Sequence, residues 1–145
     1  MAQSNAWIDH ATSALGAAGY RGGAARAAVI DHLATQACCR TALEIYEAVR
    51  SRHREVGLAS VYRALDTLTQ LRLIQRVDVG DGIARFEPAA PTGEHHHHLV
   101  CDDCGKVEAF EDRALERALD QVADTTGYAL AGHEVLLRGA CSDCR

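Results

Sequence analysis

Residues 94–104 of the chain read EHHHHLVCDDC, and a second Cys-x-x-Cys pair, Cys141 to Cys144, ends it. Two such pairs are the ligand set of a tetrahedral four-cysteine zinc site, because thiolates bind zinc and a two-residue spacer lets both sulfurs of a pair face it. The alternative is a set of disulfides or unrelated buried thiols. We therefore predict a structural zinc site at Cys101, Cys104, Cys141 and Cys144.

The row of four histidines that precedes Cys101 is too long to serve one metal ion. In a strand, successive side chains point to opposite faces, so His96 and His98 would share one face and His95 and His97 the other. A purification tag or a solvated histidine-rich loop would explain the row differently. However, the row is internal, short and continuous with the first cysteine pair. The sequence thus predicts three metal sites.

Composition and charge limit the class of protein. A chain of 145 residues with 48% hydrophobic content suits one ordinary domain or two small ones. No segment reads as a membrane span and the N-terminus lacks a secretory design, so we expect a cytoplasmic protein with no membrane partner. In that reducing compartment, six cysteines are better explained as metal ligands and thiols than as disulfides.

The two halves of the chain differ in charge. Residues 1–76 carry 9 arginines against 6 acidic residues, net +3, whereas residues 77–145 carry 6 basic against 14 acidic residues, net -8. The first half could approach nucleic-acid phosphates and the second is suited to cations, although solvated surface charge alone would look the same.

Helical periodicity dominates the first half. Apolar spacing predicts helices near residues 6–18 and 24–34, and Thr41 with Glu44 forms a capping box for a third helix. Its predicted core residues are Leu43, Ile45, Tyr46 and Val49. A fourth helix, 60–71, has an apolar stripe, which by itself is typical of an ordinary core helix.

Alternating segments at 73–79 and 83–87 flank a Gly-Asp-Gly turn and predict a hairpin. Helices followed by a hairpin are the order of a winged helix-turn-helix. We expect an α+β protein with a winged-helix domain at 1–87, a hinge at 88–94, which holds both prolines, and a metal-binding α/β domain at 95–145. In this last domain we predict strands at 96–101 and 106–110, a helix at 112–126 with Leu115, Leu119 and Val122 on one face, and a strand within 128–138.

The chain resembles the ferric uptake regulator family of bacterial metal-dependent repressors, and within it the zinc uptake regulators. The resemblance rests on residues 57–65 (GLASVYRAL), 95–101 (HHHHLVC), 104–106 (CGK) and the terminal Cys-x-x-Cys. It implies a homodimer with an N-terminal winged-helix domain and a C-terminal α/β dimerisation domain. It further implies that metal closes the DNA-binding domains onto a palindromic operator in double-stranded DNA.

The resemblance also implies which residues meet DNA. Ser60, Tyr62 and Arg63 match positions that face the major groove, and Arg21 and Arg26 match basic positions that grip phosphates. Gly22-Gly23-Ala24-Ala25 departs from the family's Thr and Pro residues, which affects how that segment docks.

Metal ligands follow from the same resemblance. His96 and His98 match sensory-metal ligands, and Glu87 matches a ligand from the other side of the hinge. One ion that takes ligands from both domains selects the closed state. On the opposite face, His95 and His97 would bind a third metal with Glu116 and His133. Taken singly, His133 is more commonly a satisfied strand histidine than a ligand.

Cys38-Cys39 stands where the iron-type pattern has a sensory histidine. Both could be core thiols, since cysteine is often buried. Alternatively Cys39, or with less support Cys38, is the fourth sensory ligand. A thiolate favours Zn²⁺ over Fe²⁺ or Mn²⁺, but Gln75 and Ala89 stand near the places where zinc-type members have Asp and Cys. Fe²⁺, Ni²⁺ or Mn²⁺ at this site therefore stay open as alternatives.

The predicted function is a zinc-sensing, DNA-binding repressor of metal-uptake genes, and not an enzyme. Iron, nickel or peroxide sensing by the same fold is the alternative. A zinc hydrolase is a more distant one, because three His or Glu ligands with an open position can activate water. No separate general base is visible in the sequence to support it.

Overall fold

The computed structural model describes residues 2–90 and 95–145, so most of the predicted hinge, 91–94, lies outside the described residues. The chain divides into two compact units, Met1–Glu94 and His95–Arg145. Each unit is described by itself below. Among the described residues, no helix combines the length and the apolar character that crossing a membrane requires.

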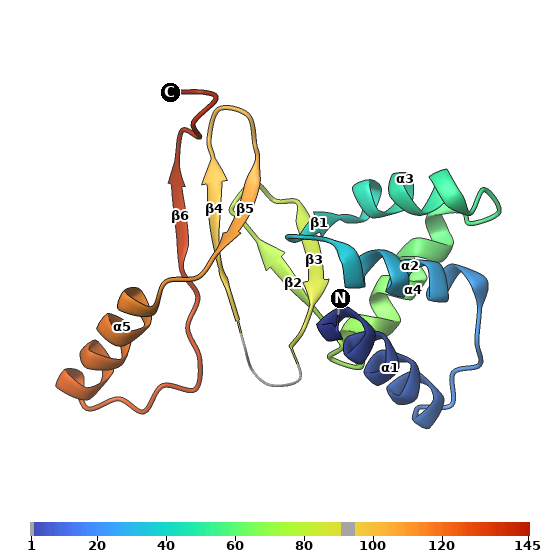
Figure 1. Cartoon of the computed structure of the whole chain (residues 1–145), viewed down its shortest axis with the longest axis horizontal. Helices are drawn as coiled ribbons and strands as arrows, with labels where there is room; N and C mark the ends of the chain where they lie inside the picture. The colour runs from blue at the N-terminus through green and yellow to red at the C-terminus, as the bar shows by residue number, and fades with distance from the viewer. Residues whose placement is uncertain (1, 91–94) are drawn as a thin grey trace. The chain divides into compact units, whose positions relative to one another are not determined.

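Unit 1 has a helical layer and a small sheet (Figure 1). Its elements are α1 (Ala2–Ala17), α2 (Ala24–Thr35), β1 (Arg40–Thr41), α3 (Ala42–Arg52), α4 (Leu58–Gln70), β2 (Ile74–Asp78) and β3 (Ala84–Pro88). The sheet is antiparallel with strand order β1-β3-β2. This confirms the predicted winged helix-turn-helix, with β2 and β3 as the wing.

The core of unit 1 is made by one face of each helix. Its fully buried side chains include Val29, Leu33, Ile45, Leu65 and Leu68. Trp7 of α1 closes one end and donates its indole N–H to the carbonyl of Leu73 at 3.3 Å. The helices thus bury the regularly spaced apolar residues that the sequence shows, and the polar face of α4 points outward.

One predicted core residue of α3 is wrong. Leu43 is 53% exposed, whereas Ala42, Ile45 and Val49 are buried. The buried residues repeat every three or four positions, and Leu43 lies about 100° round the helix from Ala42. The predicted capping box is present: the Glu44 N–H donates to the Thr41 hydroxyl, and the Thr41 N–H donates to the Glu44 carboxylate.

β1 has no counterpart among the predicted elements. It is only two residues long and pairs Arg40 with Phe86 and Thr41 with Arg85 of β3. This pairing brings the segment that ends at Cys39 beside β3. The wing turn is fixed by Asp81, whose carboxylate accepts from the Ile83 N–H at 3.0 Å and from Arg85 at 2.9 and 3.0 Å.

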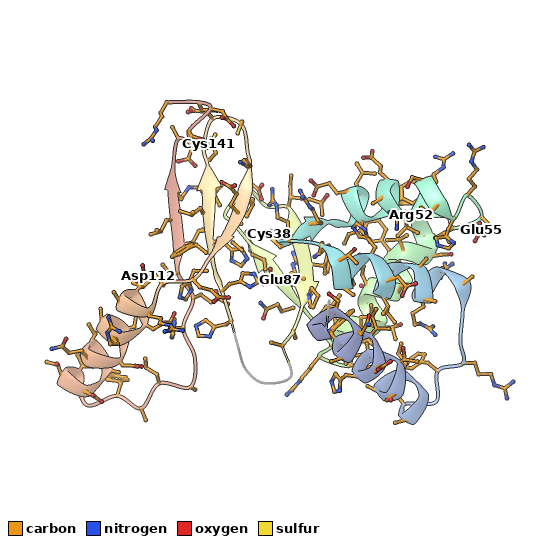
Figure 2. The ribbon with its side chains drawn as sticks, viewed as in Figure 1. Cys38, Arg52, Glu55, Glu87, Asp112 and Cys141 are labelled. Carbon is orange, nitrogen blue, oxygen red and sulfur yellow. The ribbon has the colours of Figure 1, made fainter. Side chains whose placement is uncertain are left out.

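Unit 2 contains β4 (His97–Cys101), β5 (Val107–Phe110), α5 (Arg113–Thr126) and β6 (Leu136–Gly139). Strand order is β5-β4-β6, with β4 antiparallel to β5 and parallel to β6. The Asp112 side chain (Figure 2) caps α5 by accepting from the N–H groups of Ala114 and Leu115 at 2.8 Å. At the other end, Gly127 adopts φ 76°, a left-handed backbone conformation that residues with a side chain rarely adopt.

Unit 2 leaves much of its apolar surface uncovered. Val122, predicted to share one helix face with Leu115 and Leu119, is 60% exposed, and Tyr128 is 75% exposed. Leu115 and Leu119 are half-buried. The other exposed large hydrophobic residues of this unit are Leu99, Leu130, Leu136 and Leu137. An apolar surface shared between a helix and a sheet is typical of an interaction face.

Candidate metal centres and DNA-binding surface

The four cysteines of the two Cys-x-x-Cys pairs meet at one end of unit 2. Their sulfur atoms all lie within 4.8 Å of one another. β4 brings Cys101, the turn after it brings Cys104, and the segment after β6 brings Cys141 and Cys144 (Figure 2 labels Cys141). Gly105, with φ 74°, allows the turn in which the Gly105 N–H donates to the Cys101 carbonyl at 2.9 Å.

The sulfur separations fit zinc. Sγ of Cys104 and Sγ of Cys141 are 3.8 Å apart. Two sulfurs that each lie about 2.3 Å from a tetrahedral zinc ion are separated by about 3.8 Å. None of the four cysteines forms a disulfide. A tetrahedral Zn²⁺ ion held by these four residues would tie the C-terminal segment to the end of β4.

Backbone hydrogen bonds stabilise the thiolate form of one of the four cysteines, Cys101. Donation from the N–H groups of Cys104 and Cys141 lowers the pKa of Cys101 to about 6, and the Cys141 N–H lies 3.3 Å from this sulfur. In contrast, hydrogen bonding with Cys141 raises the pKa of Cys144 to about 12. Metal binding would therefore have to displace a proton from Cys144.

A second cluster in unit 2 joins β4 to α5. It consists of His95, His97, Glu116 and His133, whose ligand atoms lie within 4.8 Å of one another. Nε2 of His97 is 2.6 Å and Nε2 of His133 is 3.1 Å from the Glu116 carboxylate. Nε2 atoms of His95 and His133 are 2.9 Å apart. Three imidazoles and one carboxylate are a donor set that suits zinc and other first-row divalent cations.

The environment of this cluster favours an ionised carboxylate. The hydrogen bond with His97 lowers the pKa of Glu116, and His133 adds to the effect. His97 is only 2% exposed and packs against the ring of Phe110 at 5.4 Å. Glu116 lies in the first turn of α5, where the helix dipole also favours negative charge.

The other two histidines of the row pair with each other. Ring centroids of His96 and His98 are 5.0 Å apart, and those of His95 and His97 are 5.2 Å apart. The row thus divides into two pairs at i and i+2, as strand alternation requires. β4 itself begins only at His97. His98 is buried and its N–H donates to the Val135 carbonyl at 3.2 Å.

In unit 1, Cys38, Cys39 and Glu87 form a buried group between the end of α2 and β3 (Figure 2). Sγ atoms of the two cysteines are 3.8 Å apart. The hydrogen bond with Cys38, together with burial, raises the pKa of Cys39 well above its usual range. Cys39 is therefore a thiol unless a cation displaces its proton.

Sequence reasoning missed one residue of this group. Gln75 of β2 pairs with Glu87 of β3, and its side-chain N–H donates to Oε1 of Glu87 at 2.5 Å. In the sequence, Gln75 stands out only because it lies near the place where zinc-type members have Asp. Its alignment with Glu87 follows from the two-strand register, which the hairpin turn alone did not specify.

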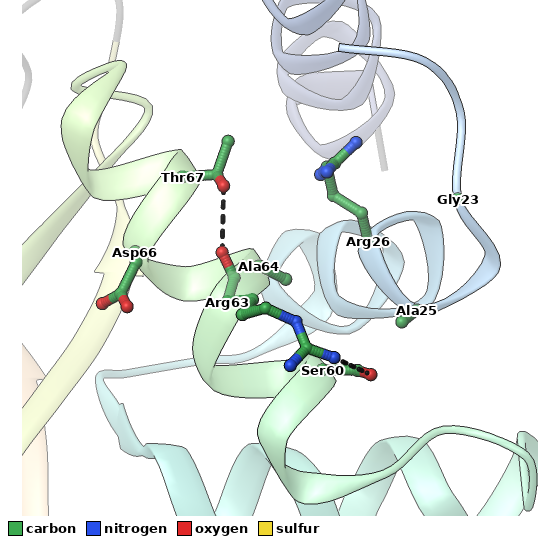
Figure 3. A pocket seen from close by; sticks show the side chains of 8 residues that line it. All are labelled: Gly23, Ala25, Arg26, Ser60, Arg63, Ala64, Asp66 and Thr67. Carbon is green, nitrogen blue, oxygen red and sulfur yellow. Dashed lines mark hydrogen bonds between the residues drawn. The ribbon is translucent and has the colours of Figure 1, made fainter.

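The predicted DNA-contacting residues of α4 lie on its exposed side. Tyr62 is 49% exposed, and Arg63 is exposed with its guanidinium donating to the Ser60 hydroxyl at 3.0 Å. A groove of about 400 Å³ lies between α4 and the start of α2. Figure 3 shows the residues that line it: Gly23, Ala25, Arg26, Ser60, Arg63, Ala64, Asp66 and Thr67. This groove places polar donors from two helices side by side.

Arg26 lines this groove, and Arg21 lies in the segment that precedes α2. The Arg21 side chain is exposed. Arg26 donates to the Arg21 carbonyl at 2.9 Å, and its guanidinium stacks 5.1 Å from the centre of the Tyr20 ring. Internal contacts therefore orient Arg26 and also fix the turn that precedes α2.

Comparison with known proteins shows the family to which the chain is similar. A profile described as "Ferric uptake regulator family" matches residues 17–138. The ferric uptake regulation protein of Cupriavidus metallidurans is 40% identical over 106 residues, which are 72% of this chain and 73% of that protein.

Two solved structures have the same fold. The ferric uptake regulator of Vibrio cholerae matches with a TM-score of 0.75 and 30% identity, covering 89% of this chain and 98% of that chain. The Helicobacter pylori regulator, described as having three functional metal binding sites, matches with a TM-score of 0.84 and 24% identity, covering 97% and 93%. The chain therefore belongs to the ferric uptake regulator family of metal-responsive, DNA-binding transcription regulators.

Proposed function

We propose that this chain is a zinc-responsive repressor that binds a palindromic operator as a homodimer and turns off metal-uptake genes when zinc is plentiful. The observation that carries the choice of metal is the buried group of Cys38, Cys39 and Glu87 in unit 1. A sulfur donor at a sensory site favours Zn²⁺ over Fe²⁺ or Mn²⁺, which prefer oxygen and nitrogen donors.

The proposed sensory site uses Cys39 and Glu87 from unit 1 with His96 and His98 from unit 2. When bound, the cation supplies the positive charge that offsets the thiolate and the carboxylate. These four side chains come from both sides of the proposed hinge, 88–94, so a state in which all four converge is favoured only when they share a ligand. We propose that this state aligns the two winged-helix domains (1–87) of a dimer with the two half-sites of an operator.

The other two clusters have separate proposed roles. Cys101, Cys104, Cys141 and Cys144 would hold a structural zinc that stabilises the domain at 95–145. His95, His97, Glu116 and His133 would hold a further divalent cation, which fastens α5 to β4 and thereby shapes the dimerisation face. The distances within each cluster support both assignments.

The DNA-binding surface is proposed to be the exposed side of α4 with the groove next to it. Ser60, Tyr62 and Arg63 would reach base edges and phosphates in the major groove, while Arg21 and Arg26 would meet the backbone. The excess of arginine in residues 1–76 supports this orientation. If double-stranded DNA is the partner, the protein is expected in the cytoplasm, where bacterial DNA lies.

The homodimer is proposed to form through unit 2. Val122, Tyr128 and Leu137 are exposed, and a second copy would cover this apolar surface. Dimerisation would present two α4 helices to two half-sites, which is why the operator should be palindromic. Sedimentation of the zinc-loaded protein should give twice the chain mass.

The deciding experiment selects operators from random double-stranded DNA with zinc-loaded protein, then measures binding across Zn²⁺, Fe²⁺, Mn²⁺, Co²⁺ and Ni²⁺ at equal free concentrations. Zn²⁺ should support binding at the lowest free concentration. Equal binding after removal of sensory metal would overturn the switch, and stronger activation by Fe²⁺ or Ni²⁺ would identify the alternative sensor.

Two variants locate the DNA surface. Arg63→Ala should weaken operator binding about 10-fold or more, since one good base contact contributes about 1–3 kcal/mol. Arg117→Ala removes an exposed arginine from α5 and is the matched control. Equal affinity of the two variants would show that Arg63 is not part of the interface.

Loss of operator binding after peroxide treatment, with oxidised histidine found by mass spectrometry, would favour peroxide sensing.

A further inference from the structure

The segment between α2 and β1 holds two neighbouring thiols in a fixed place. α2 ends at Thr35, and the Gln36 side chain donates to the Phe86 carbonyl of β3 at 2.8 Å. Four residues later, β1 pairs Arg40 with Phe86. The backbone is thus anchored to β3 on both sides of Cys38 and Cys39, and both side chains are buried.

The two sulfurs are separated by the distance that a shared tetrahedral metal ion requires. Sγ of Cys38 and Sγ of Cys39 are 3.8 Å apart, the same as Cys104 and Cys141 in the four-cysteine group. With metal–sulfur bonds of about 2.3 Å, tetrahedral geometry places two thiolates about 3.8 Å apart. Neither sulfur would need a large movement to bind the same ion.

A carboxylate completes the group from the facing strand. Glu87 is only 1% exposed, and its ligand atom lies within 4.8 Å of both sulfurs. Two core cysteines would be ordinary, because cysteine packs well in apolar interiors. A carboxylate buried beside them is costly unless it is hydrogen-bonded or binds a cation. Gln75 supplies one hydrogen bond and fixes the position of Oε1.

We propose that Cys38 and Cys39 together chelate one soft divalent cation, Zn²⁺ or Cd²⁺, with Glu87 as a third donor. This deepens the proposed sensory site, on which it rests, by adding a second sulfur to Cys39. Each thiol loses its proton to solvent as its metal–sulfur bond forms, so one M²⁺ ion releases two protons. The resulting chelate is neutral before Glu87 is counted.

Two sulfurs change what the site selects. Adding a second thiolate should raise affinity for Zn²⁺ and Cd²⁺ much more than for Mn²⁺ or Fe²⁺. All three donors belong to unit 1, so this unit would hold a soft cation through its own side chains. Histidines of unit 2 would then act on a site that is already loaded, and the soft cation would be recognised before the domains close.

The test uses the full chain with zinc retained in the four-cysteine site and Cd²⁺ as the probe. Sulfur-to-cadmium charge transfer in the ultraviolet reports each thiolate that binds. Cd²⁺ is added until one equivalent has bound without displacing zinc. The wild-type spectrum should then show two sulfur ligands. Cys38→Ser and Cys39→Ser should each remove roughly half of that intensity, because the sulfurs are equivalent soft donors. Ala37→Ser is the matched control.

Affinity and a measurement on the unmodified protein complete the test. Each cysteine variant should weaken Cd²⁺ binding at least about 10-fold, or about 1.4 kcal/mol, with a much smaller change for Mn²⁺. ¹¹³Cd NMR of the wild type should place this cadmium at a shift typical of two sulfur donors, apart from the four-sulfur signal. A one-sulfur shift, or full charge-transfer intensity in Cys38→Ser, would overturn the chelate.

Failure of this inference can be told apart from failure of the proposed function. If Cys38 is only a core thiol, Cys38→Ser keeps metal-dependent operator binding and wild-type cadmium spectra show one sulfur. If the proposed function fails, wild-type operator binding does not respond to metal, whatever the spectra show.

Discussion

Nε2 of His97, in the middle strand of unit 2, lies 2.6 Å from Oε1 of Glu116 in the first turn of α5. The imidazole is buried and the carboxylate is half-buried, so the pair connects the strand to the helix in a place with limited access to water. Oε2 of the same carboxylate lies 3.1 Å from Nε2 of His133. One acidic side chain therefore orients two of the three histidines around it.

Replacing this carboxylate should weaken both metal binding and folding of unit 2. Glu116→Gln keeps the size of the side chain but removes the charge that His97 and His133 face. We expect it to lower the free energy of unfolding, because the hydrogen bonds to a charged carboxylate are lost, and to reduce the metal content of this cluster. Thermal unfolding and elemental analysis measure the two effects. Glu111→Gln, at an exposed position, should change neither.

Loss of one cysteine from the four-sulfur group should unfold the end of unit 2. Cys141→Ser removes a ligand and also leaves the sulfur of Cys104 without its neighbour at 3.8 Å. Structural zinc contributes about 10–16 kcal/mol to folding in small zinc domains, so the variant should lose one zinc and much of its unit 2 structure. Circular dichroism with zinc analysis measures this. Ser142→Ala should keep its zinc, and a zinc-free wild type with unchanged melting would contradict the prediction.

The capping box of α3 should contribute measurably to unit 1. Thr41→Ala removes the hydroxyl that accepts from the Glu44 N–H at 3.2 Å. We expect a loss of about 1 kcal/mol in the free energy of unfolding. Adding Glu44→Ala to Thr41→Ala should lower the free energy of unfolding little further, because the two hydrogen bonds belong to the same capping box. Urea denaturation measures both, and Thr67→Ala, whose hydroxyl bonds within α4, is a control expected to lose less.

The wing turn should respond to acid in a defined range. Hydrogen bonding with Arg85 lowers the pKa of Asp81 from 3.8 to about 2. A carboxyl with a depressed folded-state pKa stabilises the fold above its unfolded pKa and loses this contribution as pH falls through the folded value. The stability difference between wild type and Asp81→Asn should therefore be full above pH 3.8 and shrink towards pH 2.

Carboxyl ¹³C NMR gives the direct measurement for this prediction. The Asp81 signal should titrate near pH 2 in the wild type and nearer its ordinary value in Arg85→Gln. Asp78, which accepts from the Gly80 N–H in the same turn, serves as an internal comparison. A normal Asp81 titration in the wild type would show that the Arg85 contact is not maintained in solution.

Local signals were enough to predict most of the elements. Thr41 with Glu44 and the Gly-Asp-Gly wing turn each act over a few residues, and each has the structure that its chemistry predicts. Their order along the chain then indicates the winged helix. Such features need no knowledge of distant contacts, which is why the sequence reveals them.

What could not be predicted depends on pairing between distant segments. β1 is too short to leave a pattern, yet its pairing with β3 positions Cys38 and Cys39. The partner of Glu87 follows from strand register, which places Gln75 opposite it. Val122 fits a helical apolar face, but within unit 2 nothing among the described residues covers it fully. Periodicity shows which side is apolar and does not show what packs against it.

Strand register also has a consequence for β4. Four identical residues in a row look the same after a slip of one position, so the histidines cannot define their own alignment with β5 and β6. That alignment is set further along, where Val100 pairs with Val107 and the Asp102 N–H donates to the Gly139 carbonyl at 2.8 Å. A slip of one residue would exchange the two histidine pairs between opposite faces. Pairing at the cysteine end of β4 thus fixes which histidine pair lies on which face of the strand.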